Sequence, residues 1–258
     1  MLKELVVITG ASSGIGSQLA RRFSAAGHPL LLLARRLKPM QELNLPNSIC
    51  ISADVTNPEA ITNAIRQAEA VYGKTDLLIN CAGVMLLGHP DRQLYTEWEQ
   101  MIDVNIKGIL TGTQAVLPDM LERNHGTIIN ISSIAGRKTF DNHAVYCGTK
   151  FAVHAITENM RKEIADKNVR LIVLAPGVVE TPLLSHTSDE GIKSDYNQWK
   201  ETINGGLDAD KIADCALFAY QMPQEVCIRE IVFAKTKQAD KKKSVKILKY
   251  LDGFFINY

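Results

Sequence analysis

The chain has 258 residues, of which 46% are hydrophobic and 22% are charged. This balance is typical of a folded globular protein and excludes a disordered or collagen-like chain. Lysine and arginine number 29 against 28 aspartates and glutamates, which gives a net charge of +1. That near-neutrality argues against a nucleic-acid partner, because phosphate binding leaves a basic excess.

The cysteines and the hydropathy pattern indicate the compartment. Five cysteines are scattered along the chain without close pairs, which predicts free thiols in a reducing environment. The six histidines show no metal-ligand spacing, so we expect no metal site. No apolar run approaches the roughly 18 residues of a membrane-spanning helix. Because the chain starts directly on a strand-like segment, we expect no signal peptide and a cytoplasmic protein.

Short apolar runs alternate with helical patterns along the chain. The runs that predict strands are residues 5–9, 29–34, 48–53, 77–80, 127–132, 169–174 and 228–233. Helical patterns cover residues 15–26, 59–72, 96–121 (interrupted by Gly108 and Pro118) and 144–166. Apolar strands separated by helices predict a parallel sheet with helices on both faces. With right-handed crossovers this gives an α/β, doubly wound, Rossmann-like fold in a single domain.

The end of the chain differs from the rest. We place the domain at residues 1–234 and a tail at residues 235–258, which carries seven lysines and then the apolar end LDGFFINY. One interpretation is a segment that binds a membrane surface or a partner. The other, which we favour, is a solvated stretch that folds back onto the domain or a neighbouring subunit, or stays disordered.

A glycine-rich turn follows the first predicted strand. It reads TGASSGIG over residues 9–16, and Ser17 stands where a P-loop needs a lysine. Residues without Cβ let the backbone approach a pyrophosphate, and the helix that follows offers unpaired N–H groups and a positive dipole end. Such a turn can also serve helix entry alone. Its place at the first strand–helix junction favours a dinucleotide site.

The end of the second predicted strand bears on the choice of cofactor. NAD-binding folds place a carboxylate there for the ribose 2′-hydroxyl, whereas this chain has Ala34, Arg35 and Arg36. Two guanidinium groups suit a 2′-phosphate through forked hydrogen bonds. We therefore predict NADP(H) over NAD(H); the alternative is that the two arginines only cap the strand.

A candidate catalytic group lies in residues 132–150, SSIAGRKTFDNHAVYCGTK. Tyr146 and Lys150 are four residues apart at the start of a predicted helix, so they share one face. A nearby ammonium favours the phenolate and makes a tyrosine a better acid–base at neutral pH. Ser133 ends the preceding strand, where its hydroxyl can hydrogen-bond a substrate oxygen. The pair alone is common in helices; with the serine and the glycine turn it predicts catalysis.

Together these motifs resemble the short-chain dehydrogenase/reductase family, in its single-domain, NADP-preferring type, from residue 5 to about residue 234. The resemblance implies catalytic roles for Asn105, Ser133, Tyr146 and Lys150, with Asn105 in a proton relay. It also implies cofactor contacts from the turn and from the motifs ADVT, NCAG and PGVVETP. The implied cofactor-binding residues are Gly10, Ser12, Ser13, Gly14, Ile15, Gly16, Arg35, Arg36, Asp54, Val55, Asn80, Ala82, Gly83, Tyr146, Lys150, Pro176, Gly177, Val179 and Thr181.

Two departures from the family's pattern are small. Cys81 replaces the usual second asparagine of NNAG, and Ser13 replaces a basic residue found in some NADP-binding members. The first should affect packing more than chemistry, and the second leaves Arg35 and Arg36 to hold the phosphate.

The resemblance implies hydride transfer between NADP(H) and a small carbonyl compound or secondary alcohol, with Tyr146 as acid–base. Loop segments are similar to those of reductases of small hydroxy acids and β-hydroxy carbonyl compounds. It further implies a homodimer or homotetramer packed through residues 96–121 and 144–166. The alternative is a catalytically idle NADP(H)-sensing regulator whose basic tail recruits a partner or membrane. Retention of all four catalytic residues argues against idleness, and a lyase or epimerase lacks an additional base.

The substrate side is less defined by the sequence. Residues 85–87 can line a substrate pocket or simply pack in the interior. Three cations precede the tyrosine, and they can hold a substrate carboxylate, although a solvated loop is favoured: Arg137, Lys138 and His143. Residues 185–206, with Tyr196 and Trp199, predict a mobile lid over the substrate.

Overall fold

The computed structural model describes residues 3–238. The lysine-rich tail predicted at residues 235–258 therefore lies outside the described residues, apart from its first four. Between residues 3 and 238, no helix has both the length and the apolar character needed to cross a membrane.

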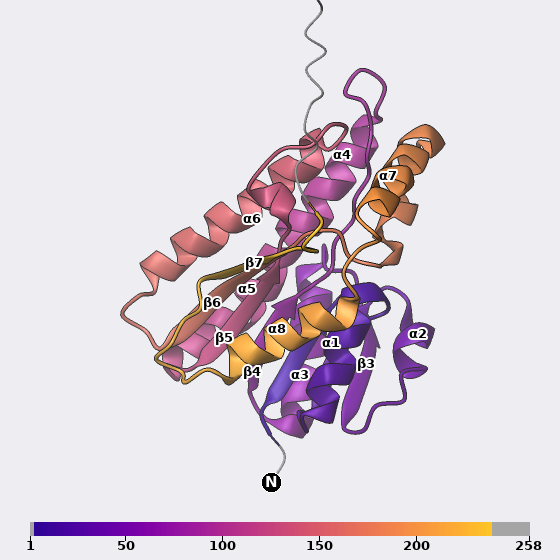
Figure 1. Ribbon diagram of the computed structural model, residues 1–258. Helices are drawn as coiled ribbons and strands as arrows, with labels where there is room; N and C mark the ends of the chain where they lie inside the picture. The colour runs from indigo at the N-terminus through magenta and orange to yellow at the C-terminus, as the bar shows by residue number, and fades with distance from the viewer. Residues whose placement is uncertain (1–2, 239–258) are drawn as a thin grey trace, which may run out of the picture.

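Seven parallel strands form one sheet in the order β3-β2-β1-β4-β5-β6-β7 (Figure 1). The strands are β1 (Leu5–Thr9), β2 (Leu30–Ala34), β3 (Ser48–Ser52), β4 (Thr75–Asn80), β5 (Gly126–Ile131), β6 (Val169–Pro176) and β7 (Glu230–Phe233). From β1 the chain first winds outward through β2 and β3, and then returns to place β4 on the other side of β1. This confirms the doubly wound, Rossmann-like prediction, and the reversal beside β1 opens a crevice at the carboxyl ends of the strands.

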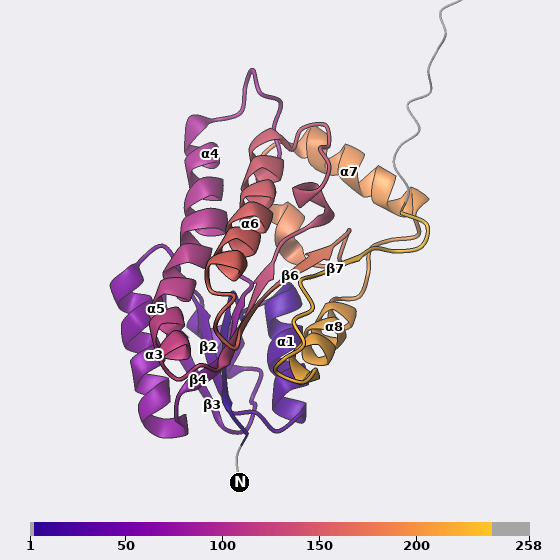
Figure 2. The same ribbon diagram turned by 90° about the vertical axis from the view of Figure 1, so that its left-hand side faces the viewer.

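Helices cover both faces of the sheet, as Figure 2 shows. One face carries α1 (Gly14–Ala25) and α8 (Ala209–Gln221), which pack against each other. The other carries α3 (Pro58–Tyr72), α5 (Gly108–Glu122) and α6 (Ala144–Glu163). Successive residues of β1 alternate between the two cores, Val6 packing under α1 and Val7 under α3. β1 and β2 are thus buried on both sides, which explains why their sequences are almost continuously apolar.

The long helix predicted over residues 96–121 is interrupted. It consists of α4 (Tyr95–Ile102), a π-helical segment (Asp103–Lys107) and α5, with Pro118 accommodated inside α5. A π-helical turn adds one residue to the backbone ring and re-aims the side chains that follow, and such turns are frequent at functional sites. The interruption rotates Asn105 into the interior, where it is fully buried.

The sequence analysis did not predict three of the helices in the described residues. They are α2 (Leu37–Gln41), α7 (Glu190–Thr202) and α8. The segment forming α7 is mostly exposed and polar, and Ile192 is its one buried residue, so its composition resembles that of a surface loop. Asp189 caps its start by accepting a hydrogen bond from the backbone N–H of Ile192. Figure 1 places α7 beyond the carboxyl ends of the strands.

Candidate functional site

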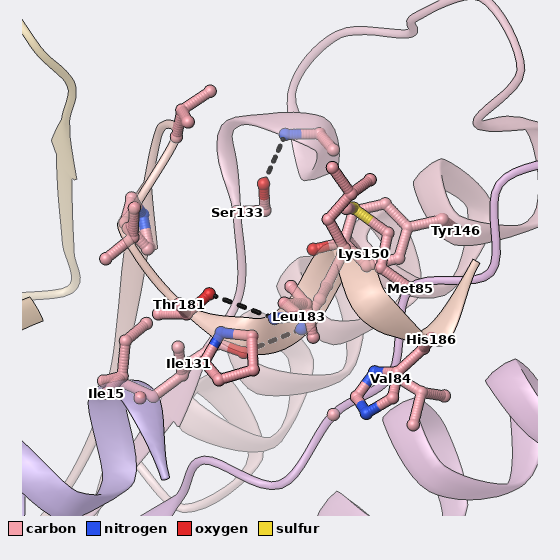
Figure 3. Close-up of a pocket in the computed structure, with 18 of the residues that line it drawn as sticks. Ile15, Val84, Met85, Ile131, Ser133, Tyr146, Lys150, Thr181, Leu183 and His186 are labelled. Atoms are coloured by element: carbon pink, nitrogen blue, oxygen red, sulfur yellow. Dashed lines mark hydrogen bonds between the residues drawn. The ribbon is translucent and has the colours of Figure 1, made fainter. Parts of the chain in front are cut away.

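The carboxyl ends of the strands open into one cavity of about 1240 Å³. Its walls come from the glycine turn before α1, the ends of β2, β4 and β5, the start of α6 and the segment after β6, with α7 at one side. All of the cofactor-binding residues predicted from the sequence line it, except Asn80. Figure 3 shows Ile15 and Thr181 in the same cavity as Ser133, Tyr146 and Lys150.

The glycine turn lies against the end of β4 at van der Waals limits. A Cβ on Gly10, whose φ is 69°, would stand 2.7 Å from the Cα of Ala82, and one on Gly16 would stand 2.2 Å from the Gly10 carbonyl oxygen. No side chain is tolerated at either position. Ser13 at the start of α1 makes no side-chain capping hydrogen bond, so the helix presents its amino end to the cavity. These features fit a bound pyrophosphate.

Two guanidinium groups border this turn. The Arg36 Nη2 atom donates to the hydroxyl oxygens of Ser12, at 3.2 Å, and Ser13, at 3.1 Å. Arg35 and Arg36 are both exposed to the cavity. Asp54 lies nearby; although burial raises its pKa, hydrogen bonds from Thr56 and the charge of Arg35 bring that pKa below its ordinary value. The charges gather where the sequence predicted a 2′-phosphate.

His186 belongs to the same region, and sequence reasoning missed it. It ends a short 3₁₀ helix (Pro182–His186) and lines the cavity. Burial lowers the pKa of His186, and the charges of Arg35 and Arg36 lower it further. The two arginines therefore act on His186 across the cavity, which no sequence spacing could indicate.

Ser133, Tyr146 and Lys150 meet at the far end of the cavity (Figure 3). Ser133 follows β5, and its Oγ accepts a hydrogen bond from the Ala135 N–H at 3.0 Å, which leaves its own hydroxyl proton to donate. Tyr146 lies on the first turn of α6. The Nζ of Lys150 donates to the Ile131 carbonyl oxygen at 3.0 Å and lies 5.8 Å from the centre of the Tyr146 ring.

Burial dominates the ionisation of this group. It raises the pKa of Tyr146, and the nearby Tyr196 adds to the rise, while a hydrogen bond with Ser133 opposes it. Burial also lowers the pKa of Lys150 to about 8. The expectation that the Lys150 ammonium lowers the pKa of Tyr146 is not met in the chain by itself, because burial raises the pKa of the tyrosine and also disfavours the charged form of the lysine.

The two buried asparagines of the predicted site play structural parts. Asn105 accepts from the Val84 N–H at 2.8 Å and donates to the Val84 carbonyl at 2.9 Å and to Thr149 Oγ1 at 3.1 Å. It thus fixes the segment after β4 against α6, although it does not line the cavity. Asn80 donates to Asn130 Oδ1 at 2.9 Å between neighbouring strands.

A polar network that the sequence analysis did not predict contacts α6 next to Lys150. His154, one turn after Lys150, makes a 2.9 Å hydrogen bond to the Lys150 carbonyl through Nδ1 and a 2.9 Å contact to Glu230 through Nε2. Glu230 also pairs with Arg137. Arg137, considered above as a cation for a substrate carboxylate, therefore forms its ion pair with Glu230 instead. The partners come from separate elements, so only the fold reveals them.

The substrate side of the cavity is largely apolar and aromatic. Met85 and Leu87 line it beyond β4, as one interpretation of residues 85–87 predicted. Residues from elsewhere complete it: Phe140, His143, Leu183, Leu184, Ile192, Tyr196 and Trp199. Gln238, the last described residue, accepts a hydrogen bond from the Val178 N–H at 3.0 Å and so holds the segment after β6.

Comparison with known proteins gives this arrangement its context. Residues 4–191 match the family described as short chain dehydrogenase. The chain belongs to the short-chain dehydrogenase family. It is 41% identical over 242 residues to an uncharacterised oxidoreductase of Staphylococcus saprophyticus, an alignment covering 92% of this chain and 97% of that one.

Similar solved structures support the same family assignment. The closed form of a serine dehydrogenase complexed with NADP⁺ is similar with a TM-score of 0.84 and 30% identity, covering 98% of this chain and 99% of that one. Serine dehydrogenase from Escherichia coli is similar with a TM-score of 0.78 and 32% identity, covering 92% and 100%. The chain is thus an oxidoreductase of the short-chain dehydrogenase family, as the resemblance implied.

Proposed function

We propose that this protein transfers hydride between NADP(H) and a small carbonyl compound or secondary alcohol, acting on CH–OH groups with Tyr146 as the acid–base. The observation that carries the proposal is the meeting of Ser133, Tyr146 and Lys150 in the cavity whose other end holds the glycine turn and Arg35 and Arg36. The similar serine dehydrogenase structure that contains NADP⁺ supports the same cofactor.

The groups of the chain divide the chemistry between them. NADPH, when bound, supplies the hydride. Tyr146 donates its proton to the carbonyl oxygen in reduction and accepts it from an alcohol in oxidation. Ser133 donates its hydroxyl proton to the same oxygen and stabilises the negative charge that develops there. Lys150 holds the nicotinamide ribose, and Asn105 keeps the wall between the lysine and β4 in place.

The bound cofactor also affects the protonation state of Tyr146. Since the chain alone raises the pKa of Tyr146, the positive charge of an oxidised nicotinamide is needed to bring it down for alcohol oxidation. In the reductive direction a protonated tyrosine is already the form required.

For the substrate class, we infer a small hydroxy acid or another β-hydroxy carbonyl compound. The cavity near Tyr146 is bounded by Met85, Leu87 and Leu183, which suits a short carbon skeleton. Two similar structures are those of serine dehydrogenases, and serine is a β-hydroxy acid, which supports this class.

The experiment is a panel of small ketones, keto acids and their alcohols, followed at the absorbance of reduced nicotinamide with NADP(H) and NAD(H). Tyr146→Phe should lower turnover by about a thousandfold, within the usual range of general acid–base catalysis. NADPH affinity, measured by titration calorimetry, should stay within about twofold because the phenol hydroxyl serves chemistry and the ring remains. Turnover that survives this substitution contradicts the role given to Tyr146.

The rival function is a catalytically idle NADP(H) sensor with a partner- or membrane-binding tail. It requires that the unmutated protein bind NADPH tightly and turn over nothing in the panel. The meeting of Ser133 and Tyr146 beside Lys150 argues against it, because binding NADP(H) needs no hydroxyl and phenol at the position of a reacting oxygen.

We also infer a homodimer or homotetramer formed through α4, α5 and α6. Large apolar side chains are exposed on this side of the molecule, namely Leu94, Tyr95, Ile102, Leu110 and Phe151. Exposed apolar side chains gathered on neighbouring helices are typical of subunit contacts. Light scattering coupled to size exclusion would give the mass, and a monomer at micromolar concentration would contradict the inference.

A further inference from the structure

His143 stands at the entrance to the catalytic helix, among aromatic rings. It is the residue before α6, and its ring centre lies 6.1 Å from that of Tyr146 and 6.3 Å from that of Tyr196 on α7. Phe140 contacts it from a third side at 5.6 Å. Rings at these separations hold one another in preferred orientations. The imidazole is thus fixed between the proposed acid–base and the helix that borders the substrate cavity.

The hydrogen bonding of His143 decides which of its nitrogens carries the proton. Nδ1 lies 2.6 Å from the Asp141 carbonyl oxygen. A carbonyl oxygen only accepts, so Nδ1 donates and carries the hydrogen. Burial lowers the pKa of His143, although the Asp141 carbonyl and carboxylate oppose this. The ring is therefore neutral at neutral pH, and Nε2 is left with a lone pair.

Nε2 has no hydrogen-bond partner within residues 3–238. Because Nδ1 is tied to the loop, Nε2 on the other side of the ring faces away from it, and His143 lines the cavity together with Tyr146 and Tyr196. Nε2 is not among the buried side-chain atoms that lack a partner, so it is open to the cavity beside the reacting groups and free to accept from a molecule that enters it. A substrate group can be that donor.

The charges around the ring favour a donor over an acceptor. Asp141 and Asp195 both line this part of the cavity, and neither forms an ion pair within the described part of the chain. Among the cations, Lys200 lies 2.9 Å from Glu180 and Lys138 stacks over Phe140 at 5.3 Å. The tyrosines at positions 146 and 196 stay protonated because burial raises the pKa of each. A hydroxyl or an ammonium group is accommodated here.

We propose that His143 is a specificity-determining residue whose Nε2 accepts a hydrogen bond from an amino or hydroxyl group on the carbon next to the reacting carbon. The inference rests on the proposed function and narrows its substrate class. A carbonyl or alcohol substrate that carries such a donor is oriented with its reacting oxygen toward Ser133 and Tyr146. A substrate that carries only a methyl group at that position leaves Nε2 unpaired.

Three alcohols of nearly equal size test this in the protein as it exists: isopropanolamine, propylene glycol and sec-butanol. They present an ammonium, a hydroxyl and a methyl group at the same position. With NADP⁺ in excess, kcat/KM for at least one of the first two should exceed that for sec-butanol by about tenfold to a hundredfold, the range of one good hydrogen bond to a polar or charged group. Which of the two is better separates an amine from a hydroxyl as the recognised donor.

Two substitutions at this position form a matched pair. His143→Phe keeps an aromatic ring and removes the acceptor, so the preference over sec-butanol should fall to within about twofold. His143→Gln places an amide near the position of Nε2 and should restore a measurable part of the preference. His125→Phe is the control, because His125 is exposed at the opposite end of the sheet, where it contacts Asp76. If the variant with phenylalanine in place of His143 does not fold, His143→Leu makes the same comparison.

The outcomes separate the two proposals. Oxidation of these alcohols with no preference for a donor overturns the role of His143 and leaves the proposed oxidoreductase activity intact. A preference that persists unchanged in the variants without the acceptor also overturns it. No NADP⁺-linked turnover with these alcohols or with any member of the wider panel contradicts the proposed function itself, and the inference with it.

Discussion

The cofactor side and the substrate side of the cavity are built from different parts of the chain. On the cofactor side the walls are strand ends and the glycine turn, and backbone atoms approach one another so closely that Gly10 and Gly16 admit no Cβ. On the substrate side the walls are side chains from α7, the segment after β6 and the loop before α6. Tyr196 and Trp199 of α7 are only partly buried.

This difference separates a cofactor side whose backbone geometry is fixed by the fold from a substrate side whose side chains can vary. Backbone geometry at the ends of buried strands is set by the sheet itself, so the cofactor side follows from the fold. Side chains on a peripheral helix can be exchanged without disturbing the core, so the substrate side can diverge among proteins that share the fold. Substitutions on the two sides should therefore have separable effects on cofactor and on substrate.

Among the substitutions that test this division of the cavity, the largest effect is expected on the cofactor side, at Arg35. Arg35→Asp replaces a guanidinium at the predicted 2′-phosphate with a repelling carboxylate, so the Kd for NADPH should rise by about a hundredfold. NADH lacks that phosphate, and its Kd should change by no more than about threefold. Fluorescence titration of both nucleotides measures the two constants. Arg66→Asp, on the exposed side of α3, is the control; equal losses for both nucleotides at position 35 would show that no phosphate binds there.

A smaller effect is expected at the boundary between the two sides, where Lys150 is fully buried. Burial lowers the pKa of Lys150 from its usual 10.5 to about 8 in the folded chain. Between these values the unfolded chain binds more protons, so folding stability rises with pH. Relative to Lys150→Met, the free energy of unfolding of the unmutated chain should gain about 2 kcal/mol from pH 8 to about pH 9.5.

Urea denaturation of the cofactor-free proteins at several pH values measures this difference. Comparison with the methionine variant removes the groups that titrate in the same window independently of Lys150. Cys81 is not one of them, because Lys150 opposes the burial that raises the pKa of Cys81, so both proteins are compared with Cys81 replaced by alanine. Parallel curves for the two proteins would mean that Lys150 keeps its ordinary pKa in the folded chain. The lysine would then be a stronger candidate for lowering the pKa of Tyr146.

What the sequence could predict follows the same division. Strands such as β1 and β2 were predictable because burial on both faces leaves a nearly unbroken apolar run. The turn at residues 10–16 was predictable because only glycine satisfies its backbone. The three-dimensional pairing of Asn80 with Asn130, and of His154 with Glu230, was not, because each joins residues from separate elements.

The substrate side of the cavity was harder to predict from the sequence than the cofactor side. The polar segment that forms α7 was expected to be a mobile lid, because most of its residues are polar and only Ile192 is buried in the fold. His143 was considered as a cation for a carboxylate or, by preference, as part of a solvated loop, since a histidine in a charged loop gives no sign of its protonation. Its bond to the Asp141 carbonyl and its aromatic neighbours emerge only from the structure.

The smallest expected effect concerns Trp199, and it contrasts two tryptophans. Trp199 lies on α7 with its ring 5.5 Å from that of Tyr196, so Trp199→Ala removes one aromatic contact of about 1 kcal/mol from the substrate wall. We expect KM to rise about fivefold, with NADPH affinity unchanged and the free energy of unfolding lowered by less than about 1 kcal/mol.

Trp98 does not line the cavity; its Nε1 donates to Gln93 Oε1 at 2.8 Å, and it packs against buried residues after β4. Trp98→Ala should therefore lose more stability than Trp199→Ala while leaving KM nearly unchanged in the protein that remains folded. The reverse pattern would mean that α7 is part of the structural core, and the division of the cavity into a fixed and a variable side would not hold.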